Sequence, residues 1–161
     1  MSGRCIVGID PGYSRIGYAA VDVVGNEFHA RIMGTWEIPR GSQSSRLEAI
    51  ETLLSSFLDK VRPSQIGIEK LFFSKNTRTA MAVAEARGVI VLAAGRQGVP
   101  LIELTPNEVK RAVTGTGAAS KASVARMARW IAKISDGKTL DDATDALAIA
   151  IAASRQTFPK D

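Results

Sequence analysis

Cysteine is nearly absent from this sequence, since Cys5 is the only one among its 161 residues. A single thiol cannot form an internal disulfide, so a small secreted fold held together by disulfides is excluded. No uncharged apolar run is long enough to cross a bilayer, and the first residues resemble neither a signal peptide nor a transit sequence. We therefore predict a cytoplasmic protein that does not bind membranes, with Cys5 as a buried structural thiol.

Acidic residues are scarce relative to basic ones: 16 Asp and Glu stand against 21 Lys and Arg, which gives a formal charge of +5. Such a surface favours a polyanionic partner such as nucleic acid, although a basic enzyme of another kind fits equally. Hydrophobic residues make up 45% and charged residues 23%, a composition that excludes a disordered chain. The length suits one domain over residues 1–161, with a short C-terminal tail from about residue 155.

The periodicity of apolar residues predicts an α/β protein. Strands are expected at Arg4–Asp10, Arg15–Val24, Glu27–Trp36, Gln65–Glu69 and Pro100–Leu104. Helices are expected from Ser45 up to Pro63, from about Asn76 to Gln97, after the capping box Thr105–Glu108, after the cap at Ser120, and from about Asp141 to Ser154. Three strands joined by short turns, followed by alternating helices and strands, predict a five-stranded mixed sheet flanked by helices on both faces.

The run Ile6–Asp10 is an apolar strand that ends on a carboxylate and is followed at once by Pro11 and Gly12. A turn of this kind leaves the backbone open to close approach by a ligand. On its own this feature predicts the binding of a divalent cation or a phosphate group, which two large superfamilies of proteins have in common. The two are distinguished by whether other acids lie near Asp10.

Three further acids are expected near Asp10. Glu69 also ends an apolar strand, and ligands gather where the carboxyl ends of adjacent parallel strands meet. Asp142 and Asp145 lie three residues apart and so share a helix face, although spacing favours Asp141 equally. Four carboxylates suit Mg²⁺ or Mn²⁺, and such clusters can hold two metal ions for phosphodiester hydrolysis. Each acid taken singly is better explained as a turn or helix cap, but that explanation is poor for all of them together.

Several motifs, in order and spacing, resemble those of the RuvC family of Holliday-junction resolvases. They are Gly8–Gly12 with Arg15–Tyr18, Ile68–Asn76, Glu85–Val89, Val109–Gly115 with Lys121, and Asp142–Ala150. The resemblance covers nearly the whole chain. It is more specific than any one motif, because the helix around Glu85 and the two lysine positions serve no generic metal site.

This resemblance implies a ribonuclease H-like fold and a Mg²⁺-dependent endonuclease of recombination and repair that cuts four-way junction DNA symmetrically. It implies a homodimer formed through the helix from about Asn76, and two Mg²⁺ ions per subunit, for which Mn²⁺ can substitute. The family's catalytic and metal-binding acids fall on Asp10, Glu69, Asp142 and Asp145. A branch-migration helicase complex is a further partner that these residues leave open.

The resemblance also implies DNA-binding residues. Lys110 and Lys121 fall on basic positions near the phosphate that is cut, and Lys121 is counted with the catalytic groups. After Glu69 comes a loop in which Phe72 falls on a position that stacks on opened bases. Lys70 and Lys75 flank it and are expected to contact DNA, although Lys70 stands where Gln is common in the family.

Three alternatives were weighed against this interpretation. An actin-like or sugar-kinase ATPase also places Asp and Gly after a buried strand, but it needs a second phosphate-binding lobe for which this chain is too short. Another ribonuclease H-like nuclease, such as a YqgF-type or RNA-hybrid nuclease, shares the opening motif but not Phe72 or the Lys110 and Lys121 pair. A non-catalytic junction-binding module would lack a carboxylate, and none of the four is missing.

Overall fold

One five-stranded mixed sheet organises the chain. The computed structural model describes residues 3–71, 77–135 and 141–156. Its strands are β1 (Arg4–Asp10), β2 (Arg15–Val24), β3 (Glu27–Glu37), β4 (Gln65–Glu69) and β5 (Leu101–Leu104), and its helices are α1 (Gln43–Val61), α2 (Thr77–Arg96), α3 (Pro106–Thr114), α4 (Lys121–Ile131) and α5 (Asp141–Ser154). The sheet order is β3-β2-β1-β4-β5, antiparallel across the first three strands and parallel from β1 to β5. This confirms the predicted fold class.

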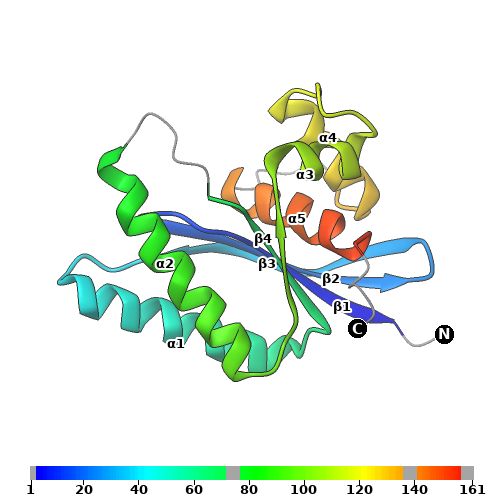
Figure 1. Ribbon diagram of the computed structural model, residues 1–161. Coiled ribbons are helices and arrows are strands. Elements are labelled where there is room, and N and C mark those ends of the chain that lie inside the picture. The colour runs from blue at the N-terminus through cyan, green and yellow to red at the C-terminus, as the bar shows by residue number, and fades with distance from the viewer. Residues whose placement is uncertain (1–2, 72–76, 136–140, 157–161) are drawn as a thin grey trace.

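Helices cover both faces of the sheet, with α1 and α2 on one side and α3, α4 and α5 on the other (Figure 1). Alternation along each strand divides the core accordingly. Ile6 belongs to the cluster beneath α5, whereas Val7 and Ile9 pack with α1 and α2. Cys5 is buried on the α1–α2 side, as predicted. Two hydrophobic layers therefore share one central strand.

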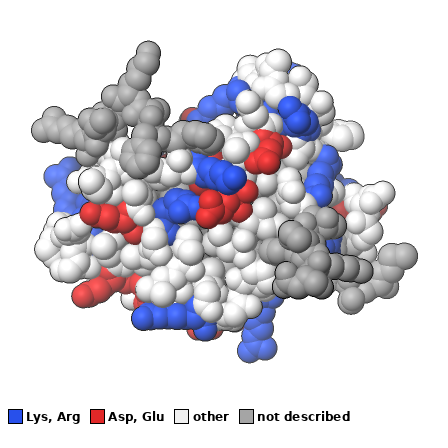
Figure 2. All heavy atoms as spheres, viewed as in Figure 1, with Lys and Arg blue, Asp and Glu red and all other residues white. Residues whose placement is uncertain are grey.

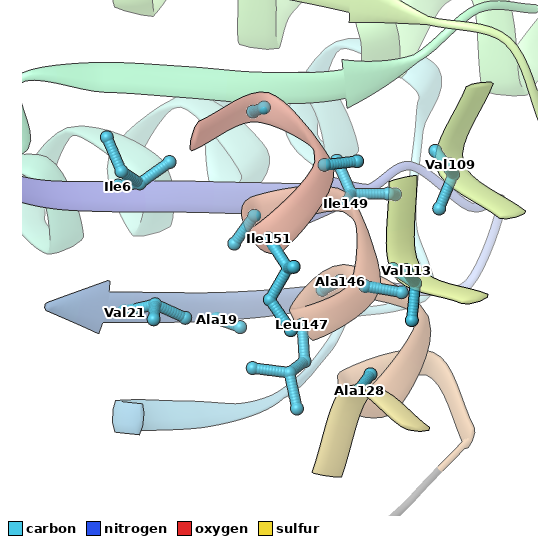
Figure 3. Packing of buried hydrophobic residues seen from close by; sticks show 14 of the residues in the cluster. Ile6, Ala19, Val21, Val109, Val113, Ala128, Ala146, Leu147, Ile149 and Ile151 are labelled. Carbon is cyan, nitrogen blue, oxygen red and sulfur yellow. The ribbon is translucent and has the colours of Figure 1, made fainter. Parts of the chain in front are cut away.

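Helix α5 lies directly against β1 and β2. Figure 3 shows Leu147 and Ile151 of α5 over the strand positions of Ala19 and Val21. Nearly all of the α5 side chains from Ala143 onward are buried, which explains why that segment is rich in alanine and isoleucine. A helix buried on most sides needs small residues to approach a sheet closely.

Glycines in the strands make this close approach feasible. A Cβ atom at Gly8 would overlap the backbone of α5 at Ala146, and one at Gly17 would overlap it at Asp142. Gly67 makes room for α5 in the same way on β4. The first two overlaps involve backbone atoms, which cannot rotate away as a flexible side chain can.

Local signals placed the element ends to within about two residues. The Thr105 capping box is present, with its hydroxyl accepting from the Glu108 N–H. Helix α1 begins at Gln43 rather than Ser45, because Ser42 is the N-cap and accepts the Ser45 N–H. In the described part of the chain, no helix combines the length and apolarity needed to cross a membrane.

Candidate active site

Two acids meet at the carboxyl ends of neighbouring parallel strands. Asp10 ends β1 and Glu69 ends β4, and the residues just before them, Ile9 and Ile68, are paired in register. Because side chains alternate along a strand, both acids point to the same face as the glycines two residues earlier, which is the α5 face. The predicted convergence of these two acids therefore follows from the parallel pairing of β1 and β4.

The first turns of α5 bring two more acids to this end of the sheet. Asp142 lies over Gly17, and its carboxylate is 3.3 Å from the Arg15 guanidinium. The Asp145 carboxylate is 3.1 Å from Nζ of Lys121, at the start of α4. Asp142 and Asp145 are thus paired with cations from two different elements, β2 and α4.

A cavity of about 340 Å³ joins the acids to the predicted lysines. Its charged lining residues are Asp10, Glu69, Asp145, Lys110 and Lys121, and its apolar lining comes from α3, α4 and α5. Asp142, the fourth predicted acid, is not part of the lining and pairs with Arg15 instead. Five of the predicted site residues therefore face one hollow.

Burial, together with the crowding of carboxylates, raises the pKa of Asp10 to about 7. Burial is the largest cause, and the nearby charges of Asp145, Glu69 and Asp142 add to it, while Lys121 opposes it. Burial and Asp145 also raise the pKa of Glu69. The hydrogen bond to Asp145 raises the pKa of Lys121, which keeps that ammonium charged. The site thus holds more negative charge than its own cation balances.

The donor set suits a hard divalent cation. Carboxylate oxygens are the ligands that Mg²⁺ and Mn²⁺ prefer, and the raised pKa of Asp10 marks a place where added positive charge would be stabilised. Within the described ranges, however, no three Asp, Glu, His or Cys side chains converge closely enough to hold a metal ion directly. The carboxylates therefore fit the cation chemically. In this structure Asp142 and Asp145 are instead paired with Arg15 and Lys121.

The other predicted DNA-binding residues lie apart from the cavity or outside the described residues. Lys70 is exposed immediately after β4, and its N–H donates to the Leu104 carbonyl. Phe72 and Lys75 lie outside the described residues. Sequence reasoning missed Arg15, which it used only as a motif position. Its pairing with Asp142 depends on α5 lying across β2, a long-range contact that no local pattern signals.

Comparison with known proteins identifies the family. The family profile described as "Crossover junction endodeoxyribonuclease RuvC" matches residues 6–153, which is nearly all of the sheet and of α5. The chain belongs to the RuvC family. The resemblance found in the motifs is therefore confirmed, and the ribonuclease H-like fold with it.

Curated RuvC proteins match over almost their full length. The chain is 42% identical to the crossover junction endodeoxyribonuclease RuvC of Pseudothermotoga lettingae over 146 residues, covering 90% of each chain. It is 43% identical to that of Heliobacterium modesticaldum, covering 91% of each. A solved structure of Thermus thermophilus RuvC in complex with a Holliday junction substrate superposes with a TM-score of 0.88 at 29% identity, covering 94% of this chain and 93% of that one.

Proposed function

We propose that this RuvC-family chain resolves four-way DNA junctions in recombination and repair by hydrolysing phosphodiesters in two opposed strands. The observation that carries the proposal is the gathering of acids from β1, β4 and α5 at one lysine-lined cavity. The Thermus thermophilus relative with the same fold is solved with a Holliday junction substrate. Identity at this level over nearly the whole chain supports the same substrate class here.

Asp10, Glu69, Asp142 and Asp145 would hold the divalent cations, in the proposal two Mg²⁺ ions per subunit, with Mn²⁺ as a substitute. Bound cations would supply an activated water and charge stabilisation at the phosphate. The present pair of Asp142 with Arg15 leaves that carboxylate at the edge of the cavity, so it must turn inward to share a ligand. Its side chain is 29% exposed and has room to do so.

Lys121 and Lys110 contribute fixed positive charge on the α3–α4 side of the cavity. Negative charge grows on the phosphate oxygens during hydrolysis, and a positioned ammonium stabilises it. Asp145 holds the Lys121 ammonium 3.1 Å away and so fixes its position. We assign Lys121 to the cut phosphate, and Lys110 to the same strand, because both side chains line the cavity with the acids.

The remaining predicted contacts belong to the same proposal. Phe72 would stack on opened bases, and Lys70 and Lys75 would steer phosphates toward Glu69. Lys70 is exposed directly beside that acid, which suits the role. Figure 2 shows acidic and basic side chains interspersed on this face of the molecule.

A homodimer would bring two such cavities to two strands of one junction. Helix α2 carries an exposed apolar stripe with Met81, which is 68% exposed, and Leu92, which is 51% exposed. Gly88 and Gly95 lie in the same stripe, and no atom comes within 4 Å of a Cβ placed at either. Glycine inside a helix lowers stability, so its presence on an open face is explained by close contact with a second helix. Association with a branch-migration helicase stays a prediction.

Substrate choice tests the function. The protein is incubated in Mg²⁺ with a synthetic four-way junction, a plain duplex and an RNA–DNA hybrid of matched sequence. We expect the junction alone to be cut, and EDTA to stop the reaction while leaving junction binding measurable by gel shift. Cutting of the hybrid with an intact junction would replace the proposal with another ribonuclease H-like nuclease.

A further inference from the structure

A second, larger hollow lies at the same end of the sheet as the cavity lined by the acids. Its volume is about 770 Å³, and its lining includes Tyr13, Arg15, Glu37, Arg40 and Arg46. They come from the turn after β1, the start of β2, the end of β3 and the beginning of α1. We call it the arginine hollow, because Arg15, Arg40 and Arg46 provide its positive charge. None of the proposed catalytic residues lines this hollow. Its one link to them is Arg15, which pairs with Asp142.

The three arginines are presented differently. Arg46 lies over the Tyr13 ring, 4.5 Å from the ring centroid, and donates to the Tyr13 carbonyl, so its guanidinium is held in place. Arg15 pairs with Asp142 at 3.3 Å and keeps a side chain that is 55% exposed. Arg40 is exposed in the connection between β3 and α1. A guanidinium has five donors, so the pairs of Arg15 and Arg46 leave further N–H groups for a ligand.

The charge of the hollow favours an anion. Of the described residues that line it, Glu37 is the only acid, against three arginines. Arginine binds phosphate through two parallel N–H donors, which a lysine cannot do. A largely polar, open hollow with three guanidinium groups suits the exposed oxygens of a phosphodiester backbone better than an apolar peptide.

The position of the hollow links it to the acids. Asp10 is paired with Gly17 and Arg15 with Glu37, so the hollow lies at the same end of the sheet as the acids (left in Figure 1). The cavity with Lys110 and Lys121 lies on the β4–β5 side of β1, and the arginine hollow lies on the β2–β3 side. Arg15 connects the two through Asp142. Cations therefore flank the acids on both sides.

We propose that the arginine hollow binds the phosphodiester backbone of the junction segment adjoining the strand that is cut. Lys110 and Lys121 neutralise phosphates on one side of the acids, and Arg40 and Arg46 neutralise them on the other. This inference rests on the proposed function, since it requires junction DNA as the substrate. It adds a binding site with a defined ligand class, the phosphate oxygens of DNA backbone.

Arg40 is the cleanest probe, because its side chain is exposed. Arg40→Ala and Arg40→Glu are compared with Lys60→Ala and Lys60→Glu, which change the same charge at the far end of α1, where Lys60 is also exposed. Junction binding is measured without Mg²⁺ between about 50 and 200 mM salt, where phosphate contacts dominate affinity. We expect Arg40→Ala to weaken binding about three- to tenfold, as for one charge-assisted contact, and to lower the salt slope by about one. Arg40→Glu should weaken binding further, and the Lys60 variants should bind as the wild type does.

Changing the DNA instead of the protein gives an independent measurement of the same contact. Single neutral methylphosphonate linkages are placed one at a time along the junction arms near the crossover. At the position that Arg40 contacts, the neutral linkage and Arg40→Ala should each weaken junction binding. When both changes are combined, the loss of affinity should be no larger than for either change alone. Wild-type slope and affinity in both Arg40 variants, or full additivity at every linkage, would overturn this inference. If the wild type itself neither binds nor cuts the junction, the proposed function fails first, and the two failures are thereby distinguished.

Discussion

The two faces of the sheet are built on opposite principles. On the α5 face, glycines in β1, β2 and β4 let the helix backbone rest on the strands, with alanines filling the remaining space. On the α1–α2 face, large side chains such as Leu54, Phe57 and Ile90 fill the space between the helices and the sheet. Tyr18 stacks on Trp36 there, with ring centroids 4.4 Å apart.

This difference in packing matches where the predicted site residues lie. All four predicted acids lie at the end of the α5 layer, where rigid backbone contact fixes the position of Asp142 and Asp145 relative to the strands. Side chains of a conventional core can adjust to substitution, whereas backbone atoms in contact cannot. We infer that the α5 face tolerates little change and positions the acids, while the α1–α2 face tolerates more substitution and carries the proposed dimer contact.

The largest expected effect concerns one charge on the α5 face. Asp145→Asn should lower junction cleavage at least about 1,000-fold, equivalent to about 4 kcal/mol in the activation free energy, since it removes a proposed cation ligand. Junction binding should persist, because the lysines and arginines remain. Single-turnover assays measure the cleavage rate, and gel-shift assays measure junction binding. The control is Asp59→Asn, an exposed acid of α1, which should cut normally; equal activity in both variants would remove the contrast between the faces.

A methyl group placed beneath α5 should damage folding. Gly17→Ala forces a Cβ into the Asp142 backbone, so we expect the free energy of unfolding to fall by about 3 kcal/mol or more, at the upper end of overpacking costs. Urea titration with circular dichroism measures the loss. Residual folded protein should also cut poorly, because the start of α5 is displaced. A variant as stable and active as the wild type would mean that α5 does not need this close approach.

The acid cluster should make stability depend on pH in the absence of divalent cations. The pKa of Asp10 is raised from 3.8 to about 7, so the folded state holds this proton more tightly than the unfolded state. The resulting stabilisation is fully present below pH 3.8 and is lost as the pH rises through 7. Asp10→Asn keeps a neutral group there, and at pH 8 in EDTA it should be more stable than the wild type by about 2–3 kcal/mol.

Urea unfolding at pH 5 and pH 8 measures this difference. The gain from Asp10→Asn should be smaller at pH 5, where the folded wild-type carboxyl is protonated. It should approach zero only below pH 3.8, where the unfolded carboxyl is protonated as well. Added Mg²⁺ should stabilise the wild type and not the variant at pH 8. A variant less stable than the wild type at pH 8 in EDTA would contradict the proposed crowding of the four carboxylates.

The smallest effect is expected on the α2 stripe. Gly88→Ala meets open space in the isolated chain, so it should stabilise the helix by about 0.5–1 kcal/mol, the usual difference between these residues. The same methyl group should weaken the proposed dimer, because it separates two closely packed helices. Sedimentation at several concentrations distinguishes the outcomes. A dimer unaffected by Gly88→Ala would place the interface elsewhere.

Much of the fold could be predicted because its signals are local. The Thr105 capping box and the apolar runs of β1 and β4 are signals carried by neighbouring residues, and all three are present as predicted. The beginning of α1 was wrong by two residues because Ser42, Ser44 and Ser45 are equivalent caps in sequence. Only the observed hydrogen bond from the Ser45 N–H to the Ser42 hydroxyl distinguishes them.

The sequence predicted which acids form the site, but not the contacts that hold them in place. Asp10 and Glu69 could be placed together because parallel strands bring their carboxyl ends to one edge. The pairing of Asp142 with Arg15, the packing role of Gly17 and the arginine hollow all depend on contacts between segments distant in sequence. No periodicity reports such contacts. The catalytic roles of the acids and lysines stay predictions until the variants are assayed.

The proposed activity depends above all on the acids held by α5 and on a four-way junction as the substrate. The most direct measurement maps the cut positions on all four end-labelled strands of a synthetic junction, with wild type and Asp145→Asn in parallel in Mg²⁺. We predict paired nicks at symmetric positions in two opposed strands for the wild type, and none for the variant. Nicks that persist in Asp145→Asn, or that fall without symmetry on all four strands, would contradict it.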